Sequence, residues 1–133
     1  MSAENEKKVS DFCFSWLKGD LAASAEYLSE DVDYHNVPWE PVTGHEGFLG
    51  VFKQFVRDDV NTLQKMEIFH STSSGNIVMN ERLEHWALGD VKMQLPVVGM
   101  FEVNADGKIC HWHDYFDAQT AAPLLEAIGK LDS

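Results

Sequence analysis

The chain has 133 residues and carries 22 acidic against 10 basic side chains, which gives a net charge of -12 with histidine neutral. A hydrophobic share of 44% is typical of a globular protein, and the length predicts one domain over residues 1–133. The acidic balance argues against nucleic-acid and anionic membrane partners, because both need clustered Lys and Arg. A neutral or cationic small molecule suits this charge better.

The cysteines and the N-terminus predict a cytoplasmic protein. Cys13 and Cys110 lie far apart, in no metal-ligand spacing, which favours two buried thiols in a reducing compartment. The segment from Met1 to Lys7 is polar and lacks the apolar core of a signal peptide. No apolar run approaches the roughly 20 residues that a membrane span needs.

The first half of the sequence is predicted to be mainly helical. Val9, Phe12 and Trp16 recur at helical spacing, and Gly19 follows as a stop signal. A second short helix is expected over residues 21–28.

A short strand and a third helix are expected next. Pro38 and Pro41 forbid a helix over residues 31–39, which predicts a strand leading into a loop. Thr43 resembles a capped helix start. The helix that follows has a wide apolar face, formed by Phe48, Leu49, Phe52, Phe55 and Val56.

The second half is predicted to form strands. Residues 66–71 are extended, and a final helix is expected near residues 119–131. Between them lie three long strands, near 76–88, 91–103 and 108–117. Helices first and an antiparallel meander afterwards indicate an α+β fold in which helices cover one sheet face.

The hairpin turns predict which strand residues lie side by side. If residue 88 pairs with 91, Arg82 lies opposite Val97 and Glu84 lies opposite Leu95. If residue 104 pairs with 107, Val97 lies opposite Asp114. Arg82, Val97 and Asp114 then form a row on one face, and Glu84 follows two residues along it.

This register places two carboxyl groups around one guanidinium. An ion-pair ladder on a solvated sheet face is one interpretation. The apolar neighbours favour a functional site instead, because charges are kept in such surroundings mainly where they have a role. A net negative charge favours a proton on one carboxyl group, and an acid facing an ionised base is what concerted catalysis requires. The predicted pocket walls are Trp86, Leu95, Val97 and Phe116.

His111 and His113 lie two residues apart, on the strand face opposite the predicted pocket. The sequence offers no evident third ligand, so we predict no metal site. Together with Tyr115 we expect the two histidines in a sheet-to-sheet contact of a homodimer. The outer face also carries apolar residues, which seldom stay exposed on a soluble monomer: Ile77, Met79 and Leu83.

Three segments resemble the limonene-1,2-epoxide hydrolase family: Tyr34 to Pro38, Glu81 to Glu84 and Trp112 to Asp117. Gly99 to Val103 also fits, and the resemblance covers about residues 6–125. It implies the cone-shaped fold shared with ketosteroid isomerase, scytalone dehydratase and nuclear transport factor 2. In that fold a curved mixed sheet wraps a deep apolar pocket that helices close. The resemblance also implies no cofactor and a dimer formed through the sheets.

The resemblance further implies a role for each site residue. In the family, an Asp takes a proton from water, the water attacks an epoxide carbon, and a second Asp donates a proton to the epoxide oxygen. By motif, Asp114 is the base, Arg82 bridges the two acids, and Tyr34 and Asn36 hold the water. The proton donor is Glu84, where the family has Asp, and the extra methylene moves the donated proton.

The sequence therefore leaves three functions to compare. The first is an epoxide hydrolase that adds water to a small, largely apolar epoxide and gives a vicinal diol. The second is a ketosteroid-isomerase-like isomerase, a polyketide cyclase or a dehydratase on the same fold. An isomerase needs one base and an oxyanion donor, so an Arg held between two carboxylates weighs against it. The third is a binding module without catalysis.

Overall fold

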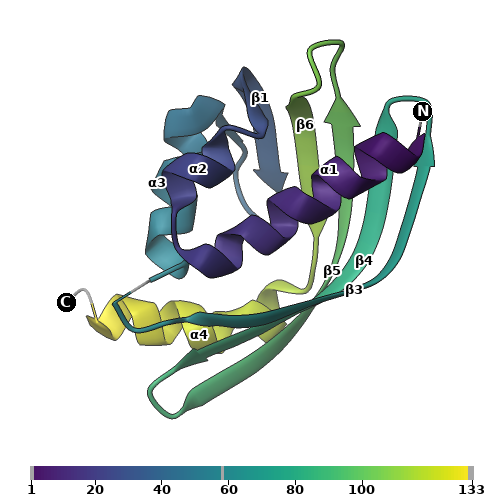
Figure 1. Ribbon diagram of the computed structural model, residues 1–133. Helices are drawn as coiled ribbons and strands as arrows, with labels where there is room; N and C mark the ends of the chain where they lie inside the picture. Colours follow the sequence, from purple (N-terminus) through teal and green to yellow (C-terminus); the bar gives the residue numbers. More distant parts are fainter. Residues whose placement is uncertain (1, 58, 132–133) are drawn as a thin grey trace.

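The computed structural model describes residues 2–57 and 59–131, which form a curved sheet with helices over its concave face (Figure 1). The first half contains α1, η1, α2, β1, β2 and α3, which span Ser2–Ser15, Trp16–Lys18, Leu21–Ala25, Leu28–Asn36, Val42–Thr43 and Gly44–Phe55. The second half contains β3, β4, β5, β6 and α4, which span Leu63–Ser74, Ile77–Leu88, Val91–Val103, Ile109–Tyr115 and Ala118–Leu131.

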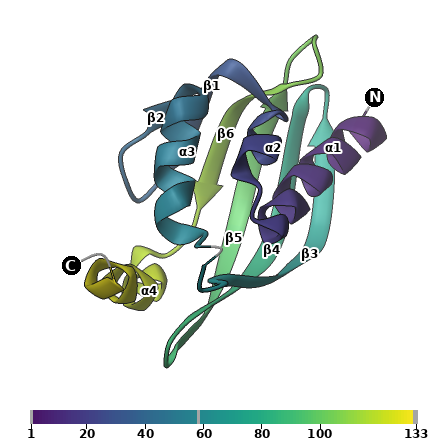
Figure 2. The ribbon, with the colours of Figure 1, turned by 60° about the vertical axis from the view of Figure 1, so that its left-hand side comes forward.

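The sheet is mixed, as expected. The strand order is β2-β1-β6-β5-β4-β3, in which β1 runs parallel to β6 while the other neighbours are antiparallel. Gly75 and Gly89 occupy the first turn position of the β3–β4 and β4–β5 hairpins with φ of 59° and 60°, a conformation that glycine adopts without strain. Figure 2 shows α1 and α3 over the inner face, with α4 near its lower end.

The predicted register is correct for one pair of strands and wrong for the other. Arg82 lies opposite Val97, and Glu84 opposite Leu95, as expected. Asp114 lies opposite Gly99, however, and not opposite Val97. The turn closes one residue later, where the Asn104 amide donates to the carbonyl of residue 108, and a β-bulge after residue 102 adds a second residue. A shift of two residues preserves the face, so Asp114 still points inward.

Several predicted boundaries also need correction. The second helix ends at Ala25, and Leu28 already belongs to β1, because it pairs with Ile109 across the parallel ladder. β3 extends beyond residues 66–71 in both directions. Thr43 is the N-cap of α3, yet its side chain makes no capping hydrogen bond; it is also the last residue of the short β2 and pairs with Asp33. Of the two cysteines, Cys13 is buried as expected but Cys110 is only partly so.

The core is aromatic, and it holds the helices against the sheet. The helical face predicted from Val9, Phe12 and Trp16 is buried, with exposures of 0%, 0% and 2%. Trp112 on β6 packs edge-on against Phe12 and stacks on Tyr34, with ring centroids 5.0 Å and 3.9 Å apart. These contacts hold α1 against the sheet, where it packs chiefly over β3 and β4, while α3 packs on β1. None of the described helices is long and apolar enough to cross a membrane.

Candidate active site

A cavity of about 540 Å³, including the part open to solvent, lies between the inner sheet face and the helices. The four walls predicted from the sequence, Trp86, Leu95, Val97 and Phe116, all line it. Two phenylalanines of α3, which are not among the predicted walls, line the cavity as well. Further lining comes from α3, α4 and the loop after β1, through Trp39, Phe52, Phe55, Leu124 and Leu125.

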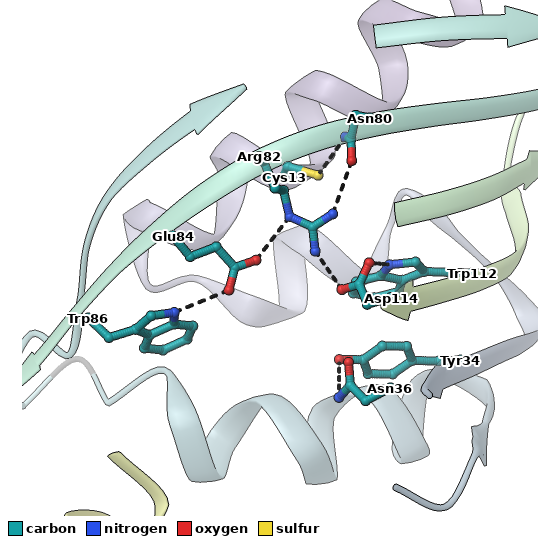
Figure 3. Close-up of polar contacts among 9 residues, drawn as sticks. All are labelled: Cys13, Tyr34, Asn36, Asn80, Arg82, Glu84, Trp86, Trp112 and Asp114. Carbon is teal, nitrogen blue, oxygen red and sulfur yellow. Dashed lines mark hydrogen bonds and ion pairs between the residues drawn. The ribbon is translucent and has the colours of Figure 1, made fainter. Parts of the chain in front are cut away.

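Arg82 is the centre of the polar network in this cavity (Figure 3). Its Nε donates to Glu84 Oε2 at 2.9 Å, and its Nη2 donates to Asp114 Oδ2 at 2.5 Å. Its Nη1 donates to Asn80 Oδ1 at 3.1 Å. The Arg82 side chain is fully buried, with its guanidinium 5.3 Å from the Trp16 ring centroid. The arginine between two carboxyl groups, expected from the sequence, is therefore present.

Each carboxyl group is held by a second donor, which comes from an indole ring two residues away on the same strand face. Trp112 Nε1 donates to Asp114 Oδ1 at 2.8 Å, and Trp86 Nε1 donates to Glu84 Oε1 at 3.1 Å. Both groups thus accept one N–H from arginine and one from tryptophan (Figure 3). Two donors on different oxygens fix the plane of each carboxyl group and leave its remaining lone pairs to the cavity.

Gly99 makes this arrangement possible, and the sequence analysis missed its role. It lies on β5 between Asn80 and Asp114. A Cβ at this position would lie 2.6 Å from Arg82 Nη1 and 2.9 Å from Asp114 Oδ1, closer than such atoms can approach. The absent side chain lets the guanidinium cross β5 and reach β6. A glycine inside a strand signals close approach of this kind and could have indicated it.

Tyr34 and Asn36 lie beside Asp114, as the resemblance implied. The parallel pairing of β1 with β6 places Asn36 directly across from Asp114. Asn36 Nδ2 donates to the Tyr34 hydroxyl at 2.8 Å. Burial, with Asp114 nearby, raises the pKa of Tyr34 well above its ordinary value, so the phenol keeps its proton. That proton and the Asn36 carbonyl oxygen remain available to a molecule bound beside Asp114.

Burial also sets the protonation of the cluster. It raises the pKa of Glu84; Arg82 opposes this effect and Asp114 adds to it. Burial lowers the pKa of Arg82, but the charges of Asp114 and Glu84 outweigh it, so the pKa rises and the guanidinium stays charged. Burial thus favours the protonated form of Glu84, the form that an apolar cavity accommodates at the lower cost.

Two other buried residues, Cys13 and Trp16, contact this network, and the sequence analysis did not connect them with it. Asn80 Nδ2 donates to the Cys13 sulfur at 3.8 Å, and burial raises the pKa of that thiol to about 12. The thiol is therefore protonated and not a nucleophile. Trp16 lines the cavity, and its Nε1 is the buried side-chain donor that finds no partner within the described part of the chain.

Solved structures share this architecture almost end to end. A limonene-epoxide-hydrolase-like epoxide hydrolase from M. tuberculosis superposes with a TM-score of 0.77 at 25% identity, covering 98% of this chain and 96% of that chain. The epoxide hydrolase/cyclase-like enzyme SalBIII, described in pyran ring formation in polyether salinomycin, gives a TM-score of 0.77 at 16% identity, over 89% and 94%. The fold is thus the cone-shaped α+β class that the resemblance implied.

Within this class the sequence defines the family. The model of the limonene-1,2-epoxide hydrolase catalytic domain matches residues 3–127, so the chain belongs to that family. It is also 30% identical over 90 residues to the epoxide hydrolase EphG of Mycobacterium tuberculosis. That alignment covers 68% of this chain and spans 58% of the relative's length.

Proposed function

We propose that the protein is an epoxide hydrolase that converts a small, largely apolar epoxide to a vicinal diol by one-step general acid–base catalysis. The observation that carries this proposal is the buried Arg82, which donates to both Glu84 and Asp114 in an apolar cavity. Membership of the limonene-1,2-epoxide hydrolase family supports it.

The water is activated on the Asp114 side of the cavity. The Tyr34 hydroxyl donates a hydrogen bond to the water oxygen, and the water donates one hydrogen bond to the Asn36 carbonyl oxygen. Asp114 takes the other water proton as the water oxygen forms a bond to an epoxide carbon, and the first proton stays on the new hydroxyl group. The bonds from Arg82 and Trp112 hold Asp114 in place during this transfer, so little reorganisation is needed.

The epoxide oxygen is protonated on the Glu84 side. As the carbon–oxygen bond of the ring breaks, its electron pair moves to oxygen, which takes the proton of Glu84. Asp114 ends the step protonated and Glu84 ionised, so proton exchange with solvent restores the starting state. The raised pKa of Glu84 supports this role, because an acid must hold its proton until the ring opens.

The walls of the cavity define the substrate class. Apart from the catalytic carboxyl groups and the Tyr34–Asn36 pair, the lining is almost wholly apolar, with the larger share from aromatic and branched side chains. An epoxide with a hydrocarbon body buries that body against these walls, while its one oxygen faces Glu84. Ring strain makes a covalent enzyme intermediate unnecessary, so simultaneous proton removal and donation suffice.

The same proposal includes a homodimer formed through the outer sheet face. Val98 and Tyr115 lie side by side on β5 and β6 and are 48% and 49% exposed, and Met79 on β4 is 46% exposed. A second copy would cover this apolar surface. Light scattering at micromolar concentration should give a mass near twice 15.0 kDa, and the monomer mass would contradict the dimer. The cytoplasmic location stays a prediction from the sequence.

The function is tested with a panel of terpene, cyclohexene and styrene oxides. We expect diol formation from at least one of them, with a preference set by the size of the hydrocarbon body. A dienone shift assay on the same preparation detects the alternative isomerase activity. No diol from any epoxide, together with a positive isomerase assay, would replace the proposal; failure of both assays would favour a binding module.

A further inference from the structure

Among the described residues, histidines and carboxyl groups meet in three groups on the outer face of the sheet. Two of them involve one histidine each: His70 bonds Glu81 at 3.1 Å and His85 bonds Glu67 at 2.7 Å. The third brings two histidines to one carboxylate oxygen. Asp33 Oδ2 lies 3.0 Å from His111 Nδ1 and 3.6 Å from His113 Nε2. This third group, called the Asp33 cluster below, consists of Asp33, His111 and His113.

The parallel pairing of β1 with β6 creates the Asp33 cluster. Asp33 lies directly across from His111 and His35 across from His113, so Asp33 falls beside both cluster histidines. The sequence analysis found no third ligand because strand spacing within β6 says nothing about β1; the structure brings Asp33 to the two histidines. His35 is a neighbour of the cluster, but its Nε2 bonds the Trp39 carbonyl at 2.8 Å.

The spacing of the three ligand atoms matches the needs of a small cation. All three lie within 4.8 Å of one another. Zinc bonds of about 2.0–2.1 Å in tetrahedral geometry separate neighbouring ligands by roughly 3.3 Å. The two distances to Asp33, 3.0 Å and 3.6 Å, lie on either side of this value. Small side-chain movements would therefore place all three atoms around one ion.

We propose that the Asp33 cluster is a binding site for a divalent transition-metal ion of the zinc type. Two imidazole nitrogens and one carboxylate oxygen form a donor set of borderline softness. Such a set binds Zn²⁺ in preference to Mg²⁺ or Ca²⁺, which favour oxygen ligands alone. In the single chain the side chains are 22% to 43% exposed, so an ion can enter before the outer faces of two copies meet in the proposed dimer, and a water molecule can complete its coordination. The net charge of -12 attracts cations to the surface.

Such an ion would join the two strands that build the catalytic cavity. Asp33 precedes Tyr34 on β1, and His113 precedes Asp114 on β6. The ion would bind the outer face while Tyr34, Asn36 and Asp114 point inward from the same strands. Its expected effect is therefore to stabilise the β1–β6 pairing. The inference does not rest on the proposed hydrolase activity, because the ligands lie outside the cavity.

The test is calorimetric titration of the whole metal-free protein with Zn²⁺ at pH 7.5, where histidine is largely neutral. The variants Asp33→Asn, His111→Gln and His113→Gln each remove one ligand. His70→Gln is the matched control, because it removes a histidine that pairs with a carboxylate on the same face. Thermal unfolding with and without Zn²⁺ provides a second measurement, and it also reports whether each variant folds.

We expect one ion per chain in the wild type and in His70→Gln, with a higher unfolding temperature when Zn²⁺ is present. Loss of any one ligand should weaken binding at least tenfold, since removal of mere outer-shell partners typically costs about 10–100-fold. Binding by the three ligand variants that is as tight as binding by the wild type would overturn the proposal. Absence of saturable binding by the wild type would also overturn it. One ion per two chains would also overturn it, because the ion would then lie between copies.

Discussion

The two faces of β1 and β6 carry polar residues of quite different character. On the inner face, Asp114 is buried and accepts hydrogen bonds from Arg82 and Trp112. On the outer face, Asp33, His111 and His113 are partly exposed and make contacts at ion-pair distance. Successive residues of one strand thus alternate between an apolar cavity and solvent.

This difference predicts which substitutions should change activity and stability. Removing one partner of a buried ion pair typically costs about 3–5 kcal/mol, because the other charge is left unpaired. Exposed ion pairs typically contribute about 0–1 kcal/mol. The inner network should therefore govern activity and stability together, whereas the outer pairs should affect neither strongly. The following predictions test that contrast.

The largest effect is expected from Asp114→Asn. The amide keeps the size of the side chain but cannot take a proton from water. General acid–base groups typically contribute about 10²–10⁴-fold each, so turnover of a good epoxide should fall at least about 10²-fold. Circular dichroism should show an intact fold. A purified variant with more than about a tenth of wild-type turnover would contradict the role of Asp114.

Glu84 should be equally necessary, but its two closest substitutions should behave differently. Glu84→Gln should lose turnover by at least about 10²-fold, because an amide is too weak an acid to protonate the epoxide oxygen. Glu84→Asp restores the family's residue and keeps the acid, but its proton retreats from the substrate. It should favour epoxides that sit deeper in the cavity. Turnover over epoxides of graded size measures both effects; a Gln variant as active as wild type would exclude Glu84 as the acid.

Gly99→Ala should damage the network without removing any of its members. The added methyl group would lie 2.6 Å from Arg82 Nη1 and 2.9 Å from Asp114 Oδ1, so the ion pair between these two side chains must shift. Overpacking of this kind typically costs about 1–3 kcal/mol of unfolding free energy. The matched control is Gly50→Ala on α3, where nothing lies within 4 Å and a slight stabilisation is expected. Urea unfolding measures both; equal stability of the two variants would contradict the role of Gly99.

The raised pKa of Glu84 predicts how stability depends on pH. The folded protein holds this proton more tightly than the unfolded chain, so the associated stability is present below the ordinary pKa of 4.5 and is lost as pH rises through the raised value. Glu84→Gln has no such proton. Urea midpoints measured at several pH values should therefore show wild type losing stability relative to the Gln variant as pH rises above 4.5. A constant difference would mean that burial does not perturb Glu84.

The smallest effect is expected on the outer face. His70→Gln breaks an exposed contact with Glu81, and neither group belongs to the cavity. Epoxide turnover and the unfolding temperature should match wild type within experimental error. A marked loss of turnover would show that the outer face influences catalysis and that the contrast between the two faces is incomplete.

Much of the fold could be predicted from the sequence, because local signals specify it. The helical spacing of Val9, Phe12 and Trp16 and the turn at Gly89 each gave the correct element. The register of β6 could not be obtained, since no sequence signal indicated that the turn closes at residue 108 or that a bulge follows residue 102. Because the register differs from the predicted one by two residues, Asp114 was still placed on the correct face.

The site could be predicted only in part, for a related reason. Alternation along β4 placed Arg82 and Glu84 on one face, and the family resemblance supplied Tyr34 and Asn36. The indole donors and the crossing at Gly99 depend on atomic contacts between strands. The Asp33 cluster depends on the β1–β6 pairing, which joins segments far apart in the chain. Contacts of this kind follow from topology, not from local pattern.

The central claim is that a water molecule activated by Asp114 attacks the epoxide directly. The most direct measurement is a single turnover in water enriched in the heavy oxygen isotope, with enzyme in excess over a good epoxide. The account predicts that the diol from this first turnover carries one heavy oxygen atom. A diol containing only light oxygen would contradict it, because that oxygen would come from a carboxylate of the enzyme through a covalent ester.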